Sequence, residues 1–508
     1  MEASKNLILK ADENMKKLLS VLITLALILT IIAGCSNSTP EPSVDESDFD
    51  IGSTPPLTTD VPDTESPPIV SGGGSETEER ELEWWEIDVV RVPDDLVPDP
   101  SQTGELNLFF VYNPDTFVYT PVINRYRVIY PNVNLIVEST NGNFDAYSTR
   151  LSTELMAGTG PDVISPSQIA GADVVKMADA GVFMDLNKLI ESDDSFNLDD
   201  YVGAVMDGGV LNGKRYIMPH NFLINSLLYV PSRLESIGFD MSQMNDPILF
   251  MDEIVRTLPK AQETHGFRYM YNGNLLVLLF RTSGIKIIDE ETKTVLPDEE
   301  HFERFIKAYK PYYRFDMYSG QREWNDTSGG LINSKLIMFD QITTILDFVW
   351  HAGTLKRFSG EIQMHTMPDI NGENQVYLVD SIAIREGTPN EQNAWNFVKL
   401  LLSEENQSRA HFSQIPVHKN VIFPQIIFAY NDGSIPGLDF LGYKSQLSTE
   451  EIEVFYEMVT GVTARHYYND WFYLPLIWDY LMSYFEDETS YEDMVARIKN
   501  DLRLYLSE

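Results

Sequence analysis

Past its N-terminal region, the chain alternates short apolar runs with stretches in which apolar residues recur every three or four positions. Residues 106–112 form an apolar run, residues 134–138 alternate, and residues 162–164 follow a Gly/Pro-rich breaker, which predicts three strands. The spacing within residues 117–129 and 144–155 predicts a helix between each pair of strands. This order indicates right-handed crossovers and a mainly parallel sheet, so we predict an α/β fold.

Two helices further along carry N-terminal capping signals. Thr388 and Glu391 have the spacing of a capping box, with Pro389 at the first helical position. Thr489 and Glu492 have the same spacing at the start of the last predicted helix. The apolar stripe of that helix consists of Met494, Val495, Ile498 and Leu502.

The composition is that of a folded globular protein, with 43% hydrophobic and 22% charged residues among 508. The 77 acidic against 37 basic residues give a net charge of −40. Such a surface repels phosphate backbones, which excludes nucleic-acid binding through a basic footprint. A single cysteine, Cys35, excludes an internal disulfide framework, a cysteine-based zinc site and an iron–sulfur cluster.

The N-terminus has the pattern of a secretory signal peptide. Met15-Lys16-Lys17 is followed by a 15-residue segment with only three polar residues, shorter than the about 20 apolar residues of a membrane span. Translation starts at either Met1 or Met15, and we favour Met15 because acidic residues before it make a poor n-region.

The signal segment closes with Ile32-Ala33-Gly34-Cys35, which resembles the lipobox of bacterial lipoproteins. That resemblance implies cleavage before Cys35, a diacylglyceryl group on its sulfur, and a lipid anchor at the extracellular face of the cell membrane, which two acyl chains hold stably. The alternative is a signal anchor with a chance cysteine.

Residues 36–103 are acidic and rich in proline, with 18 acidic residues, two arginines and ten prolines. Such a segment cannot bury enough apolar surface to offset its chain entropy, so we predict a disordered stalk. Trp84-Trp85 is an exception that could dock on the body or on a partner. The remaining residues, 104–508, are enough for two lobes of ordinary domain size.

Five segments of this body, taken in order, resemble the large extracellular solute-binding proteins of ABC importers, especially the carbohydrate-binding branch. Each segment is individually weak, whereas the order of all five along the body is specific. The segments are residues 155–164 (LMAGTGPDVI), 178–186 (ADAGVFMDL), 212–219 (NGKRYIMP), 388–397 (TPNEQNAWNF) and 414–417 (QIPV).

The resemblance implies a periplasmic-binding-protein-like fold: two α/β lobes with mainly parallel central sheets joined by crossover hinge strands. Closure about the hinge would bury a solute between the lobes, and an ABC permease would accept the closed form. The expected organisation is a signal peptide with lipobox (1–35), a stalk (36–103), a first lobe (104–218 plus 376–440) and a second lobe (219–375 plus 441–508).

The implied ligand is a small solute, and we expect a mono- or oligosaccharide. A sugar site needs flat aromatic faces with carboxylates and amides beside them, although an aromatic in a helix or strand more often packs in the core. Carboxyl ends of strands are where open α/β sheets bind ligands. Candidates at the ends of the first and third predicted strands are Tyr112, Asn113, Ser165, Ser167 and Gln168.

Further candidates come from the crossover, from polar loops and from positions that the family implies. His220 and Asn221 follow the crossover motif and are either ligand contacts or a hinge-packing pair. Asp340 and Gln341 match a ligand loop of the family, although Ile342-Thr343-Thr344 stands where the family often has Trp. The remaining candidates are Trp324, Trp350 and Trp471.

Sequence motifs for catalysis are absent: the chain has no His-Glu-x-x-His, Gly-x-Ser-x-Gly or Walker-type glycine loop. We therefore expect no enzyme activity, no cofactor, no metal and a monomer. Three alternatives remain open. A lipid-anchored glycoside hydrolase needs only two carboxylates at about 5–10 Å, which spacing in sequence cannot measure. A sensing or adhesion lipoprotein would lack a permease. The solute could also be a peptide or a polyamine, and an acidic cleft would suit the polyamine.

Overall fold

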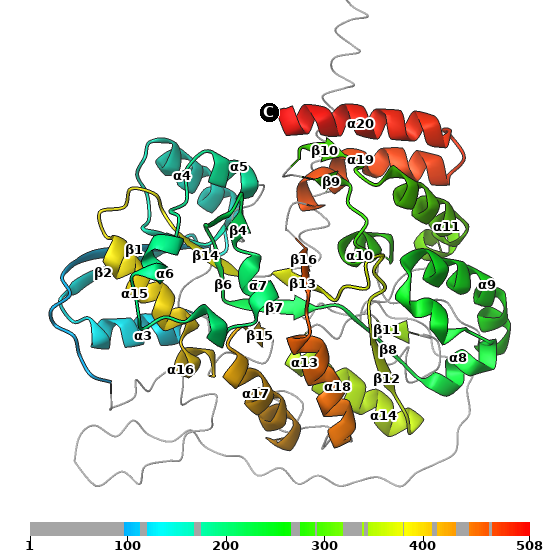
Figure 1. The fold of residues 1–508 in the computed structure, drawn as a ribbon, viewed down its shortest axis with the longest axis horizontal. Helices are drawn as coiled ribbons and strands as arrows, with labels where there is room; N and C mark the ends of the chain where they lie inside the picture. The colour runs from blue at the N-terminus through cyan, green and yellow to red at the C-terminus, as the bar shows by residue number, and fades with distance from the viewer. Residues whose placement is uncertain are drawn as a thin grey trace, which may run out of the picture. The chain divides into compact units, whose positions relative to one another are not determined.

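The computed structural model describes most of the body within one compact unit, Arg80–Glu508 (Figure 1). The described residues are 96–111, 119–166, 174–265, 275–289, 292–318, 338–339, 344–378, 380–408, 414–432, 447–466 and 470–507. The predicted signal peptide, Cys35 and most of the predicted stalk lie outside them. The end of that stalk already contacts the body, because the Asp99 amide donates to Ile129 O at 2.6 Å and Asn132 Nδ2 to Pro100 O at 2.7 Å.

The first sheet has the strand order β2-β1-β3-β14-β6 (Figure 1). Its strands are β1 (Gly104–Phe110), β2 (Val133–Ser139), β3 (Val163–Ile164), β14 (Ser381–Ile384) and β6 (Met218–Pro219). The pairs β1–β2 and β1–β3 are parallel, which confirms the predicted start of the fold. Strand β14 enters between β3 and β6 and is antiparallel to both.

Two helices connect the three parallel strands, as the periodicity predicts. Helix α3 (Thr120–Ile129) buries Val122, Ile123 and Tyr126, and helix α4 (Phe144–Met156) buries Tyr147 and Leu151. Helix α4 begins where the Asn143 side chain accepts a hydrogen bond from the Ala146 amide at 2.9 Å.

A second sheet has the order β15-β7-β13-β16, and a third has the order β11-β8-β12. Among the described pairings of these two sheets, only β13–β16 is parallel. The described part of the second sheet is therefore less parallel than expected, because β7 and β13 carry the chain in opposite directions between the sheets. The strands are β7 (Asn221–Ile224), β8 (Ser226–Tyr229), β11 (Met338–Phe339), β12 (Gln363–Thr366), β13 (Gln375–Leu378), β15 (Ile415–Pro416) and β16 (Ala464–His466).

The remaining described elements are α-helices, two short hairpins and the short 3₁₀ helices Leu198–Asp200 and Met241–Asn245. No helix within the described ranges is both long and apolar enough to cross a membrane. The hairpins are β4–β5 (Val210–Leu211 and Lys214–Arg215) and β9–β10 (Ile288–Asp289 and Thr294–Val295). The helices are α5 (Val174–Asp179), α6 (Asn187–Glu191), α7 (Gly203–Asp207), α8 (Pro231–Ile237), α9 (Pro247–His265), α10 (Leu275–Thr282), α11 (Glu299–Tyr318), α13 (Ile345–Asp347), α14 (Gly353–Ser359), α15 (Glu391–Leu402), α16 (Glu404–Gln407), α17 (Lys419–Asp432), α18 (Thr449–Thr460), α19 (Asp470–Phe485) and α20 (Tyr491–Ser507).

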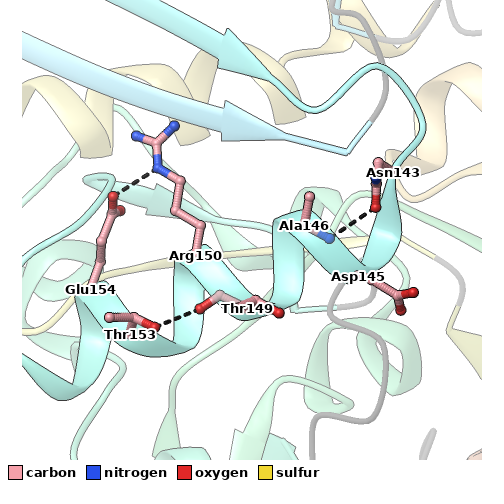
Figure 2. A pocket seen from close by; sticks show the side chains of 7 residues that line it. All are labelled: Asn143, Asp145, Ala146, Thr149, Arg150, Thr153 and Glu154. Carbon is pink, nitrogen blue, oxygen red and sulfur yellow. Dashed lines mark hydrogen bonds and ion pairs between the residues drawn. The ribbon is translucent and has the colours of Figure 1, made fainter.

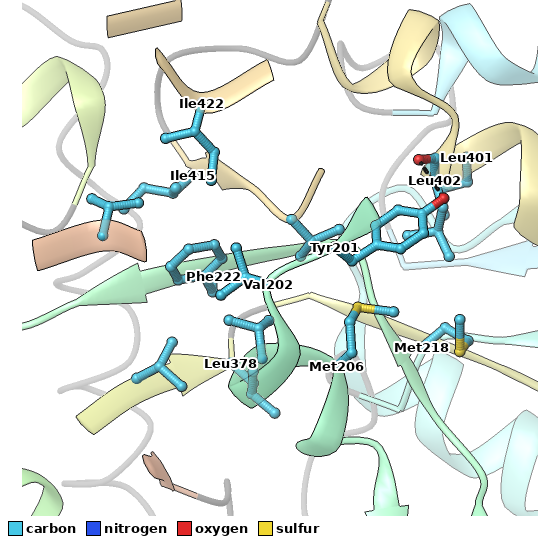
Figure 3. Packing of buried hydrophobic residues seen from close by; sticks show 14 of the residues in the cluster. Tyr201, Val202, Met206, Met218, Phe222, Leu378, Leu401, Leu402, Ile415 and Ile422 are labelled. Carbon is cyan, nitrogen blue, oxygen red and sulfur yellow. Dashed lines mark hydrogen bonds between the residues drawn. The ribbon is translucent and has the colours of Figure 1, made fainter. Parts of the chain in front are cut away.

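Buried apolar side chains gather in separate clusters. One cluster draws only on the stretch from Leu227 to Tyr313, on Met367, and on residues of α19 and α20. Another includes side chains from both the first and the second sheet, among them Met218, Phe222 and Leu378 (Figure 3). The apolar packing is thus continuous where the two sheets meet.

The structure corrects both predicted helix caps. Helix α15 begins at Glu391 after Asn390, and Thr388 Oγ1 accepts from the Asn390 amide at 3.1 Å, before the helix, instead of from its first turn. The Thr388 hydroxyl also donates to the buried carboxylate of Asp162. At α20 the cap is one residue later than predicted, since Ser490 Oγ accepts from the Asp493 amide at 3.0 Å. The predicted apolar stripe of α20 is confirmed, because all four of its residues are buried.

Candidate functional site

The described strands take the chain between the first and second sheets three times, and two of these crossings are direct and adjacent. The chain passes from β6 to β7 through His220 and returns from β13 to β14 just before Ser381, while the third crossing leads from β14 through α15 and α16 to β15. The His220 amide donates to the Asp380 carbonyl at 3.1 Å, so the two crossings are joined through their main chains.

The Asp380 side chain ties the crossings together a second time. Its Oδ2 accepts hydrogen bonds from Asn221 Nδ2 at 3.0 Å and from Gln414 Nε2 at 2.7 Å. The Asp380 amide donates to Asn221 Oδ1 at 3.2 Å, and Asn221 Nδ2 also donates to Gln414 Oε1. Through these hydrogen bonds, Asp380 in the second crossing is joined to Asn221 at the start of β7 and to Gln414 just before β15.

The His220 imidazole lies in the interior, with only 3% of its surface exposed. Its Nε2 is 3.3 Å from the Tyr119 hydroxyl, and its Nδ1 is 3.3 Å from Asn221 Nδ2. Burial lowers the pKa of His220 below its usual value, although the negative charge of Asp380 opposes that shift. The imidazole is therefore neutral at pH 7.

Tyr119 connects this cluster to the first sheet. Its ring stacks on Phe110 of β1 with centroids 4.4 Å apart. After β3, Ser165 Oγ donates to the main-chain oxygen of Ser381, the neighbour of Asp380, at 3.2 Å. Burial, then the charge of Asp380, raises the pKa of Tyr119 well above its usual value, so the hydroxyl stays protonated.

The structure brings together three of the predicted site residues: Ser165, His220 and Asn221. Trp350 belongs to another element, a π-helical turn (Phe348–Ala352), and is half-buried. The centroid of its ring lies 6.1 Å from that of His351. Trp471 lies in α19, where only its backbone is described. The other predicted ligand contacts lie outside the described residues: Tyr112, Asn113, Ser167, Gln168, Trp324, Asp340 and Gln341.

We call the residues that meet at the two direct crossings the crossing cluster: Tyr119, Ser165, His220, Asn221, Asp380 and Gln414. Sequence reasoning missed three of them, Tyr119, Asp380 and Gln414. Tyr119 falls inside a predicted helix, where a core role is the usual reading of an aromatic. Asp380 carried a usable signal, since it stands directly before the apolar strand that returns to the first sheet. Gln414 begins the Ile-Pro segment, whose resemblance to the family implies no role for its side chain.

A surface pocket of about 560 Å³ lies along α4 and is lined by seven residues of that helix and its N-cap (Figure 2). The Arg150 guanidinium in it pairs with Glu154 at 2.7 Å, an ordinary helix-surface ion pair. None of the predicted ligand residues lines this pocket, so the crossing cluster remains the better candidate site. In the described ranges, no group of three or more His, Cys, Asp and Glu side chains could hold a metal ion.

The comparisons with known proteins agree with this architecture. Residues 132–422 match the family described as bacterial extracellular solute-binding protein. No curated protein matches the chain. The structure is similar to that of the sugar-binding protein MalE from Xanthomonas citri, with a TM-score of 0.56, 14% identity, and coverage of 80% of this chain and 98% of that one.

Two further solved structures show the same fold. The GacH receptor of Streptomyces glaucescens has a TM-score of 0.51 at 16% identity, covering 80% of this chain and 99% of that one. An extracellular solute-binding protein family 1 member from Alicyclobacillus acidocaldarius has a TM-score of 0.54 at 15% identity, covering 82% and 100%. The fold is therefore periplasmic-binding-protein-like, as expected. Because the family match extends over more than half of the sequence, this chain belongs to the bacterial extracellular solute-binding protein family.

Proposed function

We propose that this protein is an extracellular receptor, anchored to the membrane through a lipid on Cys35, that captures a mono- or oligosaccharide by hinge closure. The captured solute is then delivered to the transmembrane subunits of an ABC permease. The proposed lobes are those expected from the sequence, 104–218 plus 376–440 and 219–375 plus 441–508, with β13 and β15 of the first lobe pairing with β7 of the second. No bond of the solute is broken.

The paired crossing at His220 and Asp380 carries this proposal. Two adjacent strand connections limit the relative motion of the two sheets to rotation about one line, which suits opening and closing around a solute. A solute that contacts both lobes stabilises the closed state. The fraction of protein that is closed therefore follows the fraction that has bound solute. The permease then needs only to distinguish closed from open protein.

A saccharide is the favoured solute because of what similar proteins bind. GacH was solved in complex with acarbose, and a similar Listeria monocytogenes substrate-binding protein (TM-score 0.51, 13% identity) in complex with cycloalternan. This chain has 7 tryptophans and 25 tyrosines, which supply aromatic faces for sugar rings. The aromatic ligand contacts that we propose are Tyr112, Trp324, Trp350 and Trp471, and the polar contacts are Asn113, Ser165, Ser167, Gln168, His220, Asn221, Asp340 and Gln341.

Titration of the intrinsic tryptophan fluorescence tests the solute class. Maltose, longer maltooligosaccharides, acarbose, spermidine and a short peptide are added separately to the full-length protein. We expect a saturable change with at least one saccharide and none with spermidine or the peptide. A response to spermidine or the peptide alone would overturn the saccharide assignment.

The same samples distinguish a receptor from a glycoside hydrolase. After prolonged incubation, chromatography of the saccharides is expected to show only the starting material. Cleavage products would instead support the hydrolase alternative, in which two carboxylates of the chain act on the glycosidic bond.

The anchor is tested by expressing the chain and its Cys35→Ser variant in a bacterial host that processes lipoproteins. The unmodified chain is expected in the membrane fraction, with incorporation of a labelled fatty acid that the variant loses. Equal labelling of both chains would contradict a lipid on Cys35.

A further inference from the structure

Helix α5, in the first proposed lobe, contacts the last turn of α20, in the second. Lys176 Nζ on α5 donates to the main-chain oxygen of Tyr505 at 2.8 Å. The same ammonium lies over the Tyr505 ring, 4.4 Å from its centroid. Figure 1 shows the C-terminal end of α20 pointing toward α5. One lysine therefore contacts one tyrosine twice, at the main chain and at the ring.

The two residues belong to parts of the molecule with separate apolar packing. Val174 and Ala178, two positions before and after Lys176, are buried together with side chains of β1 and β3. The Tyr505 ring packs against a different cluster, formed in part by α9, α11, α19 and α20. Within the described ranges, no strand of the first sheet contributes to that second cluster. The contact between Lys176 and Tyr505 thus joins two cores that are otherwise distinct.

The end of α20 is a favourable place for a lysine from another element. Helix α20 ends at Ser507, so the Tyr505 oxygen belongs to its last turn. The carbonyl groups of a last turn point out of the helix end and carry its partial negative charge, which attracts a cation. The face of an aromatic ring attracts a cation as well. Both attractions act on the ammonium of Lys176 at once.

We propose that Lys176 and Tyr505 form a latch between the two lobes, which stabilises the closed arrangement, in which α5 touches α20. A rotation about the crossings that moves α5 away from α20 breaks both contacts, so the latch favours closed over open protein before any solute binds. This inference rests on the proposed function, because a receptor that is closed more often binds its solute with a higher apparent affinity. The latch itself needs no solute.

The latch is measured as a distance distribution between two spin labels by pulsed electron paramagnetic resonance. In the full-length chain with Cys35→Ser, cysteines replace Ser152 on α4 and Asp252 on α9, both of which are exposed. Without any ligand, Lys176→Met is expected to shift the ratio of closed to open protein about ten-fold toward open, through loss of a charged hydrogen bond and of the contact with the ring. A Lys176→Met distribution that superimposes on that of the unsubstituted chain would overturn the proposal.

Lys310→Met is the matched control, because Lys310 makes the same pair of contacts within one lobe. Its Nζ donates to the main-chain oxygen of Tyr484 at 2.6 Å and lies 3.9 Å from the centroid of that ring. It also pairs with Asp487 at 2.7 Å, so its loss disturbs local packing at least as much. We expect Lys310→Met to leave the distance distribution unchanged. An equal shift in Lys176→Met and Lys310→Met would indicate general loosening and overturn the latch.

Tyr505→Leu tests the latch from its other side and does not depend on how Lys176→Met folds. It keeps the main-chain oxygen that Lys176 binds and removes the ring, so a smaller shift toward open, about three-fold, is expected. In a chain that already carries Lys176→Met, Tyr505→Leu should add nothing, because the two residues act as a pair. Full addition of the two shifts would contradict a direct contact between them.

The proposed function can fail separately from the latch. For a saccharide that the unsubstituted chain binds, Lys176→Met should raise the apparent dissociation constant by up to about ten-fold and Lys310→Met should not. If no saccharide changes the distances or the fluorescence of the unsubstituted chain, capture of a saccharide is wrong. The ligand-free comparison of Lys176→Met with Lys310→Met still decides whether the latch holds the lobes together.

Discussion

Asp162 shows how one buried carboxylate can join distant parts of the first sheet. It accepts from the Asn107 amide at 2.7 Å and from Asn390 Nδ2 and the Thr388 hydroxyl, and it lies 3.7 Å from the Arg385 guanidinium. Its 1% exposure leaves no water to replace these partners. The residue thus fixes the entry to β3 against β1 and against the segment after β14.

Asp162→Ala is expected to lower the free energy of unfolding by about 3–5 kcal/mol, because it leaves Arg385 buried without its counter-charge. Urea unfolding followed by circular dichroism measures this change. Glu138→Ala is the control: it removes the half-exposed partner of Arg150 on the surface and should cost less than about 1 kcal/mol. Equal losses in the two variants would contradict a special role for Asp162.

The buried histidine at the crossing predicts a dependence of stability on pH. Since the pKa of His220 is lower in the folded protein than the ordinary 6.5, the unfolded chain binds more protons as the pH falls. The contribution of this residue to stability is therefore present above about pH 6.5 and is lost as the pH falls below that value. Urea unfolding at a series of pH values should show a smaller loss in His220→Gln than in the unsubstituted chain.

At the scale of single elements, α20 depends on its buried stripe. Leu502 is fully buried, whereas Leu504 on the same helix is 58% exposed. Leu502→Ala should cost about 2–5 kcal/mol through lost burial and a residual cavity, and Leu504→Ala less than about 0.5 kcal/mol. Thermal unfolding of the two variants checks this, and a similar melting temperature for both would contradict the packing of α20.

The start of α20 offers a test of the corrected cap. Ser490→Ala removes the acceptor of the Asp493 amide and is expected to cost about 1 kcal/mol, whereas Thr489→Ala should have little effect. Urea unfolding distinguishes the two substitutions. A larger loss for Thr489→Ala would restore the register predicted from sequence.

The outcomes for apolar helix faces and for helix caps show what local sequence can predict. The apolar periodicity correctly predicted α3, α4 and the buried face of α20, because each helix buries the residues that recur every three or four positions. The cap at Thr388 was wrong because its oxygen accepts from the Asn390 amide in a turn before the helix, while its proton is donated to Asp162, 226 residues away. Spacing alone cannot reveal such a tertiary partner.

At the scale of the whole molecule, solute binding should appear as added stability. A saccharide that binds only the folded protein raises the free energy of unfolding by about 2.7 kcal/mol at 100 times its dissociation constant. Differential scanning calorimetry should show a melting temperature that rises with saccharide concentration and is unchanged by spermidine. Leu249→Ala, a change at an exposed apolar residue, should leave the rise intact.

The candidate site was only partly predictable, because some of its residues are far apart in the sequence. Ser165, His220 and Asn221 stand beside recognisable segments, so the sequence pointed to them. Asp380 is 159 residues from Asn221, and nothing local shows which of 77 acidic residues approaches that amide. The hinge-packing alternative for His220 and Asn221 accords with their hydrogen bonds to Asp380, Gln414 and Tyr119, while their contact with a solute remains a prediction.

The position of β14 in the first sheet has a consequence for how the chain folds. This strand pairs with β3 through residues more than 200 positions apart, and it separates β3 from β6. A nascent chain that ends before Ser381 therefore has an incomplete sheet, with the edge of β3 open to other strands. Because such long-range pairing is slow, we expect this half of the protein to remain unstructured until late in synthesis and to be the part most in need of a holding chaperone.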